Sequence, residues 1–318
     1  MKFKAFVAVF MTILLLTGCS YAPGISGFSF WEMPDHVPDL PIEEYHASNV
    51  LAAEDKVREP IPDPKVKLDE LPVRQDTDLV LVKDYIPDIE VDLQYATAGN
   101  FTKKQVYEFT DLYLRYGTVI KLMLAQQELR TYGLRLKVWD GFRPVSAQYD
   151  LWIAYPNPVY VVNPENGFSD HSKGGSLDVT LVDALGYELE MPSQYDDFTS
   201  KADRNYSDCS EKAAENAALL QAVMEKYGFA GDEKEWWHFV DRTEYPVEEC
   251  FDPGLISQWY AVCNEYINLR TAPDVNAESI DQIPANARFT LLGWSGRFAY
   301  VEFQGLRGYV NADYIDEV

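Results

Sequence analysis

The sequence predicts an α+β domain in the middle of the chain, followed by a small all-β unit. Between about residues 79 and 240, short alternating stretches are interspersed with two longer segments whose apolar residues recur at helical spacing. After about residue 253, short alternating stretches with frequent turns replace this pattern. At 318 residues, with 47% hydrophobic and 14% aromatic residues, the chain can fold into two such domains.

The N-terminus has the composition of an export signal. Two lysines precede an apolar run of 12 residues, which is shorter than the roughly 20 residues that span a bilayer. The motif Leu16-Thr17-Gly18-Cys19 resembles the bacterial lipobox, which implies that residues 1–18 are removed and that Cys19 is diacylated. Two acyl chains give stable anchoring, so we expect an extracellular protein that is lipid-anchored to the bacterial cell membrane. Ordinary signal cleavage beside a chance cysteine is the alternative.

Residues 19–76 are rich in Pro, Asp and Glu. Such a composition buries little apolar surface and stays extended, so this segment is predicted to be a tether. The predicted domains are therefore a lipoprotein signal peptide at 1–18, the tether at 19–76, the α+β domain at 77–253 and the β unit at 254–318.

The net charge of −24 makes nucleic acid a poor partner, because affinity for nucleic acid comes mostly from Lys and Arg that neutralise phosphates. Such acidity is typical of a soluble surface. With Cys19 assigned to lipid, three cysteines are left, without a CxxC spacing, which excludes an all-cysteine zinc site. One disulfide and one free thiol are compatible with this number, and the sequence does not select a pair among Cys209, Cys250 and Cys263.

The elements of the α+β domain follow from their patterns. Alternation of apolar and polar residues predicts strands, and apolar positions at helical spacing that stop at a glycine predict helices. One predicted strand leads directly into the segment Asp140-Gly-Phe-Arg-Pro144 and so delivers Arg143 to a turn. The predicted strands are 79–82, 89–95, 134–139, 176–182 and 235–240, and the predicted helices are 112–132 and 211–227.

Two histidines of the α+β domain form the core of a candidate metal site. His171 lies seven residues before Asp178, and the intervening Gly174-Gly175 pair permits the chain to turn so that both side chains reach one ion. His238 follows three residues after Glu235. Two imidazoles and one carboxylate leave one tetrahedral position of zinc free for water, which is typical of a catalytic site.

Glu235 and Arg143 have side chains that suit the chemistry beside such an ion. Glu235 is the predicted general base, and Arg143 is predicted to stabilise the developing oxyanion. A regular strand would send Glu235 and His238 to opposite faces, because positions three apart are out of phase with a period of two. We therefore expect Glu235 at the start of the strand or on a bulge.

These motifs resemble those of the D-alanyl-D-alanine dipeptidases of vancomycin resistance. That family belongs to a wider zinc peptidase fold shared with D,D-carboxypeptidases, lysostaphin-type enzymes and the hedgehog signalling domain. The segment from Ser169 to Asp178 is similar to the family's S-x-H-x-x-G-x-A-x-D, with Ser176 in place of the usual Ala. The other similar segments are Glu235-Trp-Trp-His238, Asp92-Leu-Gln-Tyr-Ala-Thr97 and Asp140-Gly-Phe-Arg-Pro144.

The resemblance implies a role for each matching residue. It implies that His171, Asp178 and His238 hold one zinc ion, with Glu235 as the base and Arg143 at the transition state. It also implies that Ser169, Asp196 and Tyr95 bind substrate, with the segment around Asp196 receiving the ammonium group. A carboxylate there is a sound way to select a free N-terminus.

The part after residue 253 resembles a bacterial SH3-like domain. Its expected role is to bind wall peptides and so to concentrate the enzyme on its substrate. The alternative is a barrel that only packs against the catalytic body. Trp294, Tyr300 and Tyr309 fit either a core or a binding groove.

The predicted function is hydrolysis of D,D-peptide bonds in D-Ala-D-Ala or peptidoglycan stem peptides, by a zinc dipeptidase or D,D-carboxypeptidase. The expected partners are those peptides and the membrane, and the chain is expected to be a monomer. Two alternatives stay open: a non-catalytic peptidoglycan-binding lipoprotein, and an L,D- or endopeptidase of the same fold. Glu235 favours an enzyme, because a purely zinc-binding module needs no base.

Overall fold

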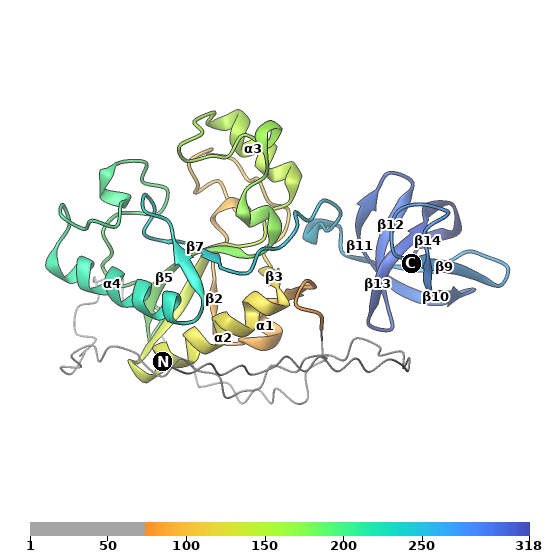
Figure 1. The fold of residues 1–318 in the computed structure, drawn as a ribbon, viewed down its shortest axis with the longest axis horizontal. Coiled ribbons are helices and arrows are strands. Elements are labelled where there is room, and N and C mark those ends of the chain that lie inside the picture. Colours follow the sequence, from red (N-terminus) through yellow and green to blue (C-terminus); the bar gives the residue numbers. More distant parts are fainter. Residues whose placement is uncertain (1–73) are drawn as a thin grey trace, which may run out of the picture. The chain divides into compact units, whose positions relative to one another are not determined.

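The computed structural model of this protein describes residues 74–318 (Figure 1). The predicted signal, Cys19 and all but the last residues of the predicted tether lie outside this range. The described residues all belong to one compact unit. Within them, no helix has both the length and the apolar character required to cross a membrane.

A five-stranded sheet forms the framework of the α+β domain. Its edge strand β2 pairs in parallel with β4, and all its other strand pairs are antiparallel. The antiparallel part places β5 in the centre, where both faces of the strand are buried. In spatial order the strands are β2 (Glu90–Val91), β4 (Leu134–Asp140), β5 (Ser176–Asp183), β7 (His238–Asp241) and β6 (Phe229–Gly231).

Two long helices pack on this sheet and on each other. Helix α2 (Tyr116–Thr131) contacts β4, and helix α4 (Glu211–Lys226) contacts β5 and β6. Figure 1 shows both helices along one side of the sheet, away from α3 (Val145–Ala154). Because strand residues alternate between faces, three apolar residues of β5 share one face, and Asp178 lies on the other. These three are Leu177, Val179 and Leu181, all fully buried.

Tertiary pairing changes some of the elements expected from local patterns. The segment predicted to start a helix at residue 112 first forms β3 (Tyr113–Arg115), because it pairs antiparallel with β1 (Leu79–Leu81). Of the strand predicted at 89–95, only β2 forms, and a 3-10 turn follows at Gln94–Ala96. Three further elements of this domain, α1 (Val82–Tyr85), α3 and β6, were not predicted.

The C-terminal part is an all-β unit, as predicted, and it has seven strands. All neighbouring strands are antiparallel. A compact apolar core, which includes Leu269, Val301 and Val310, fills it. In spatial order the strands are β10 (Ser279–Pro284), β9 (Tyr266–Arg270), β13 (Leu306–Asn311), β12 (Phe298–Phe303), β11 (Arg288–Ser295), β8 (Ser257–Ala261) and β14 (Ile315–Glu317).

The three aromatic residues that fitted either core or groove are half-buried and pack against neighbouring side chains. Trp294 packs against the barrel core and contacts Trp259, with ring centroids 5.4 Å apart. The Tyr309 hydroxyl lies 3.7 Å from the Cys250 Sγ, and the Tyr300 and Tyr309 rings are 5.0 Å apart. Trp294 therefore packs within the barrel, whereas Tyr309 contacts the segment that precedes it.

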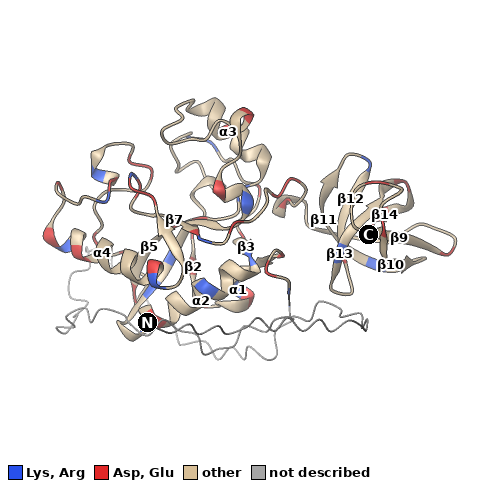
Figure 2. Ribbon diagram, in the orientation of Figure 1, with Lys and Arg blue, Asp and Glu red and all other residues tan. Residues whose placement is uncertain are grey.

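Charged residues are distributed over both domains. Figure 2 shows Lys and Arg on several separate elements rather than gathered on one. The expectation that nucleic acid is not a partner stays a prediction.

Candidate metal centre and active site

A row of cross-strand neighbours carries three polar side chains on the face of the sheet opposite the helices. Asp140 at the end of β4 is the register partner of Asp178 in β5, and Asp178 is the register partner of His238 in β7. A bulge in β4 at Trp139 shifts the alternation by one residue and brings Asp140 into line. Direct cross-strand partners project to the same face, so the row forms the floor of a site.

His171 reaches this row from a short 3-10 helix, Asp170–Lys173. Ser169 caps that helix, because its Oγ accepts a hydrogen bond from the His171 backbone N–H at 3.3 Å. Gly174 then adopts a left-handed conformation with φ of 76°, and a Cβ there would lie 2.6 Å from Leu79 Cδ2. The paired glycines therefore make the turn that the sequence predicted.

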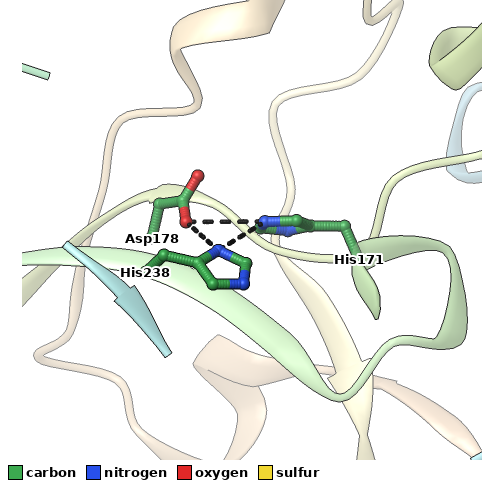
Figure 3. A group of neighbouring side chains, drawn as sticks. All are labelled: His171, Asp178 and His238. Atoms are coloured by element: carbon green, nitrogen blue, oxygen red, sulfur yellow. Dashed lines mark hydrogen bonds and ion pairs between the residues drawn. The ribbon is translucent and has the colours of Figure 1, made fainter. Parts of the chain in front are cut away.

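The side chains of His171, Asp178 and His238 converge on one point (Figure 3). His171 Nε2 lies 3.3 Å from His238 Nδ1 and 3.4 Å from Asp178 Oδ1, and the last two atoms are 2.8 Å apart. Ligand atoms bound tetrahedrally to zinc at about 2.0–2.1 Å are separated by about 3.3 Å. The donor set and its spacing therefore fit a divalent metal ion, as the sequence predicted.

Each of these three side chains is oriented by a further hydrogen bond. The Nδ1 of His171 lies 2.8 Å from the Gly141 carbonyl oxygen, which can only accept, so Nδ1 carries the proton and Nε2 is free to bind a metal. Tyr195 donates to Asp178 Oδ2 at 2.8 Å, and Ser176 Oγ lies 3.3 Å from His238 Nε2. Such partners fix the direction of each ligand.

Buried charge interactions keep Asp178 ionised. Burial opposes its charge, but the two neighbouring imidazoles, His171 above all, outweigh that effect and hold the pKa of Asp178 below its usual range. A permanently ionised carboxylate between two imidazoles is a suitable ligand for a cation.

Glu235 lies just before β7, so the alternation of that strand does not apply to it. The backbone N–H of His238 donates to the Glu235 carbonyl oxygen at 3.1 Å, which closes a turn between the two residues. Both side chains then line the same cavity. Burial raises the pKa of Glu235 to about 8. The nearby His238 lowers this pKa, and the charge of Asp178 raises it further. A carboxyl with such a pKa can accept and return a proton near neutral pH.

Arg143 is buried and held in one orientation. Its Nε and Nη2 donate to Asp140 Oδ2 at 3.2 and 2.6 Å, and its Nη1 donates to Gln148 Oε1 at 2.8 Å. Burial disfavours its charge, but the Asp140 carboxylate more than offsets this and raises the pKa of Arg143. A fixed guanidinium at the cavity wall can stabilise negative charge that develops during a reaction.

The cavity beside these residues has a volume of about 200 Å³. All three predicted substrate-binding residues, Ser169, Asp196 and Tyr95, line it. The Tyr95 hydroxyl donates to Asp196 Oδ2 at 3.2 Å. Burial, reinforced by the charge of Asp178, raises the pKa of Asp196 to about 8. The aromatic rings of Phe101, Tyr160 and Phe198 form part of the wall.

Several residues that contact the side chains of this site escaped the sequence interpretation. Tyr195 and Asp140 lie inside motifs that were recognised. In those motifs the predicted roles went to the neighbouring Asp196, as a substrate-binding residue, and to Arg143, as the residue that stabilises the oxyanion. Gln148 lies on α3, a helix that was not predicted, and nothing in its sequence context indicates contact with Arg143.

The structure also shows the state of the cysteines and of the two tryptophans that precede His238. Cys209, Cys250 and Cys263 are all free, so the disulfide that the sequence allowed is absent among the described residues. Trp236 and Trp237 are buried core residues, and Trp237 also lines the cavity.

Comparisons with known proteins identify a family for each of the two domains. Residues 75–252 match a family model described as D-ala-D-ala dipeptidase, and residues 265–316 match one described as bacterial SH3 domain. A D-alanyl-D-alanine dipeptidase of Escherichia coli strain K12 is 36% identical over 173 residues, which cover 54% of this chain and 89% of that protein. One of Enterococcus faecium is 32% identical over 181 residues, covering 51% and 90%. The chain therefore belongs to the D-Ala-D-Ala dipeptidase family of metallopeptidases and carries a bacterial SH3 domain after its catalytic domain.

Proposed function

We propose that this protein is a zinc-dependent dipeptidase that hydrolyses D-Ala-D-Ala outside the cell membrane, in the maturation or turnover of peptidoglycan. One observation carries the proposal. Three convergent ligand atoms, a carboxyl with a raised pKa and a fixed guanidinium all face the same small cavity. That combination supports hydrolysis of a peptide bond rather than simple binding.

The mechanism follows from the positions of the side chains. Zinc held by His171 Nε2, His238 Nδ1 and Asp178 Oδ1 would polarise the scissile carbonyl and make a water molecule more acidic. Glu235 accepts the proton of the attacking water and then passes it to the leaving amine. Arg143 stabilises the negative charge on the carbonyl oxygen, and its clamp by Asp140 and Gln148 means that no reorientation is needed during the reaction.

The cavity favours a free dipeptide over a longer stem peptide. Its volume of about 200 Å³ suits a small substrate, and Asp196 lies in its wall. A substrate ammonium group beside Asp196 would stabilise the ionised carboxylate and so offset the effect of burial. A stem peptide has an amide at this position and could not form that ion pair, so we place D,D-carboxypeptidase and endopeptidase activity second.

We further propose that the enzyme acts as a monomer held at the membrane by lipid on Cys19. The SH3-like domain would bind wall peptides in a groove of about 740 Å³. Tyr266 and Tyr314 line that groove and are 47% and 50% exposed. Exposed aromatic side chains that line one groove are typical of a binding surface.

The test is release of alanine from D-Ala-D-Ala and from purified muropeptides, with and without chelator, read by mass spectrometry. We expect wild-type protein to cleave the free dipeptide, chelator to stop it and zinc to restore it. Glu235→Gln should lose activity while still binding zinc. Alanine loss from intact muropeptides without cleavage of the dipeptide would indicate a carboxypeptidase. Zinc binding without any turnover would indicate the non-catalytic alternative.

A further inference from the structure

Strand β11 of the SH3-like domain contains a bulge at Leu292. Leu291 pairs with Val301 and Gly293 pairs with Tyr300, so Leu292 is an extra residue without a partner on β12. A bulge breaks the alternation of a strand and re-aims one side chain. Leu291 belongs to the core of the barrel, whereas Leu292 belongs to a separate cluster.

The backbone of Leu292 and Gly293 is bonded to the segment that connects the two domains. The Asp252 N–H donates to the Leu292 carbonyl oxygen at 2.9 Å, and Phe251 forms a β-bridge with Gly293. A Cβ on Gly293 would lie only 1.5 Å from the Cys250 carbonyl oxygen, so glycine is required for this close approach.

The other buried members of the cluster that contains Leu292 belong to the catalytic domain and the connecting segment, and Tyr300 of the SH3-like domain packs against it from its edge. Its members are Leu79, Phe142, Phe251 and Leu292, and none is more than 4% exposed. The Phe142 and Phe251 rings contact edge to face, with centroids 5.6 Å apart. Leu292 thus fills a buried apolar space that the catalytic domain does not fill alone.

Two parts of the active site rest on this cluster. Phe142 lies between Gly141, whose carbonyl accepts from His171 Nδ1 at 2.8 Å, and the catalytic Arg143. Leu79 packs under the turn at Gly174 that follows His171. Packed interiors transmit displacements, because their side chains interlock at high density.

We propose that Leu292, a residue of the SH3-like domain, is a positioning residue of the active site, acting through Phe142 on Arg143 and on the Gly141 carbonyl. The inference rests on the proposed function for its effect on turnover. It gives the SH3-like domain a second role, because the domain completes the support of the catalytic loop in addition to any binding of wall peptides.

The experiment compares Leu292→Ala with Leu291→Ala in the full-length protein. The two residues are adjacent, buried and chemically identical, but only Leu292 belongs to the cluster beneath Phe142. A displacement of about 1 Å at a reacting group can cost about 100-fold in rate. At a temperature where circular dichroism shows both variants folded, we expect Leu292→Ala to lower kcat for D-Ala-D-Ala about 10- to 100-fold. KM should change by less than about threefold, and Leu291→Ala should retain wild-type kcat.

Zinc affinity gives a second measurement that does not depend on turnover. Because Gly141 orients His171, Leu292→Ala should weaken zinc binding about tenfold in competition with a chromogenic chelator. This measurement decides the inference even where wild-type protein shows no hydrolysis and the proposed function itself fails. If Leu292→Ala does not fold, Leu292→Val is measured in its place, with the same direction expected. Equal kcat and equal zinc affinity in the Leu292 and Leu291 variants would overturn the proposal.

A double variant tests the route of the effect. If Leu292 acts through Arg143, Leu292→Ala should lower kcat less in an Arg143→Lys background than in wild type. Full additivity of the two losses, together with unchanged zinc affinity, would contradict the proposed route.

Discussion

The Oδ1 atom of Asp178 lies 2.8 Å from Nδ1 of His238, across two strands in which these residues are direct partners. Their pairing leaves the other imidazole nitrogen, Nε2, facing Ser176 Oγ at 3.3 Å. Ser176 also approaches the Phe239 carbonyl oxygen at 3.3 Å, where its hydroxyl donates. The serine oxygen can then accept the Nε2 proton, which selects the tautomer that exposes Nδ1 to the metal.

Ser176→Ala should therefore weaken zinc binding. Loss of such an orienting partner typically costs 10- to 100-fold in metal affinity, and we expect about tenfold for a neutral hydroxyl. Competition with a chromogenic chelator measures it. The control is Ser172→Ala, since Ser172 is equally buried and its hydroxyl has no hydrogen-bond partner. An affinity equal to that of wild type in both variants would refute this role for Ser176.

Gln148 is expected to affect turnover through Arg143. Gln148→Leu removes the acceptor for Arg143 Nη1 and leaves the Val162 carbonyl without its donor. Because the guanidinium is still held by Asp140, we expect kcat to fall only about tenfold, less than the 10²- to 10³-fold loss typical of a direct oxyanion donor. Steady-state kinetics on D-Ala-D-Ala provides the measurement.

The control for this variant is Gln126→Leu. Gln126 is also fully buried, but it bonds to Asp88 and to the Leu136 backbone, away from the cavity. Both variants should lower stability, and only Gln148→Leu should lower kcat. A similar loss of kcat in both variants would mean that Gln148 contributes to stability alone.

Asp196 is expected to set the preference for a free amino group. Asp196→Asn keeps the shape but removes the charge, and a hydrogen bond to a charged group contributes about 1.5–3 kcal/mol. We therefore expect KM for D-Ala-D-Ala to rise about 10- to 100-fold, with little effect on an N-acetylated dipeptide. Asp197→Asn is the matched control, because Asp197 accepts from the Thr199 backbone outside the cavity. Equal KM values in both variants would assign the ammonium group to another residue.

The stability of the metal-free protein should decrease as pH rises. The pKa values of Asp196 and Glu235 are raised to about 8, so each carboxyl binds its proton more tightly in the folded chain than in the unfolded chain. Between about pH 4 and pH 8 the folded state then holds more protons, and its stability falls with pH. The pKa of His171 is also raised, despite burial, by Asp178 and Asp140, and its contribution is lost in the same direction.

Melting temperatures in the presence of chelator, measured from pH 5 to pH 8.5, test this expectation. Glu235→Gln removes the cost of a buried charge, so the variant should melt at a higher temperature than wild type at pH 8.5 and show a smaller decrease with pH. The two proteins should differ little at pH 5, where Glu235 is protonated in the folded state. A wild-type melting temperature that rises over this range would contradict the shifted pKa values.

The sequence by itself determined which residues could hold a metal and which could act as base. Only His171 and His238 were available outside the predicted tether, and the glycines after His171 required a turn. Helix α4 was also predictable, because its apolar periodicity agrees with the face that it buries. Alternation likewise predicted strands β4 and β5, although both faces of β5 and nearly all residues of β4 are buried. In these cases local pattern and tertiary environment point to the same structure.

Other features depend on contacts between segments that are distant in the sequence. Pairing with β1 turns the first residues of a predicted helix into β3, and no local pattern records that pairing. The contact between Gln148 and Arg143 requires α3, and the cluster around Leu292 joins residues more than two hundred positions apart. Periodicity reports which face of an element is buried, whereas the identity of the partner is decided only when the whole chain packs.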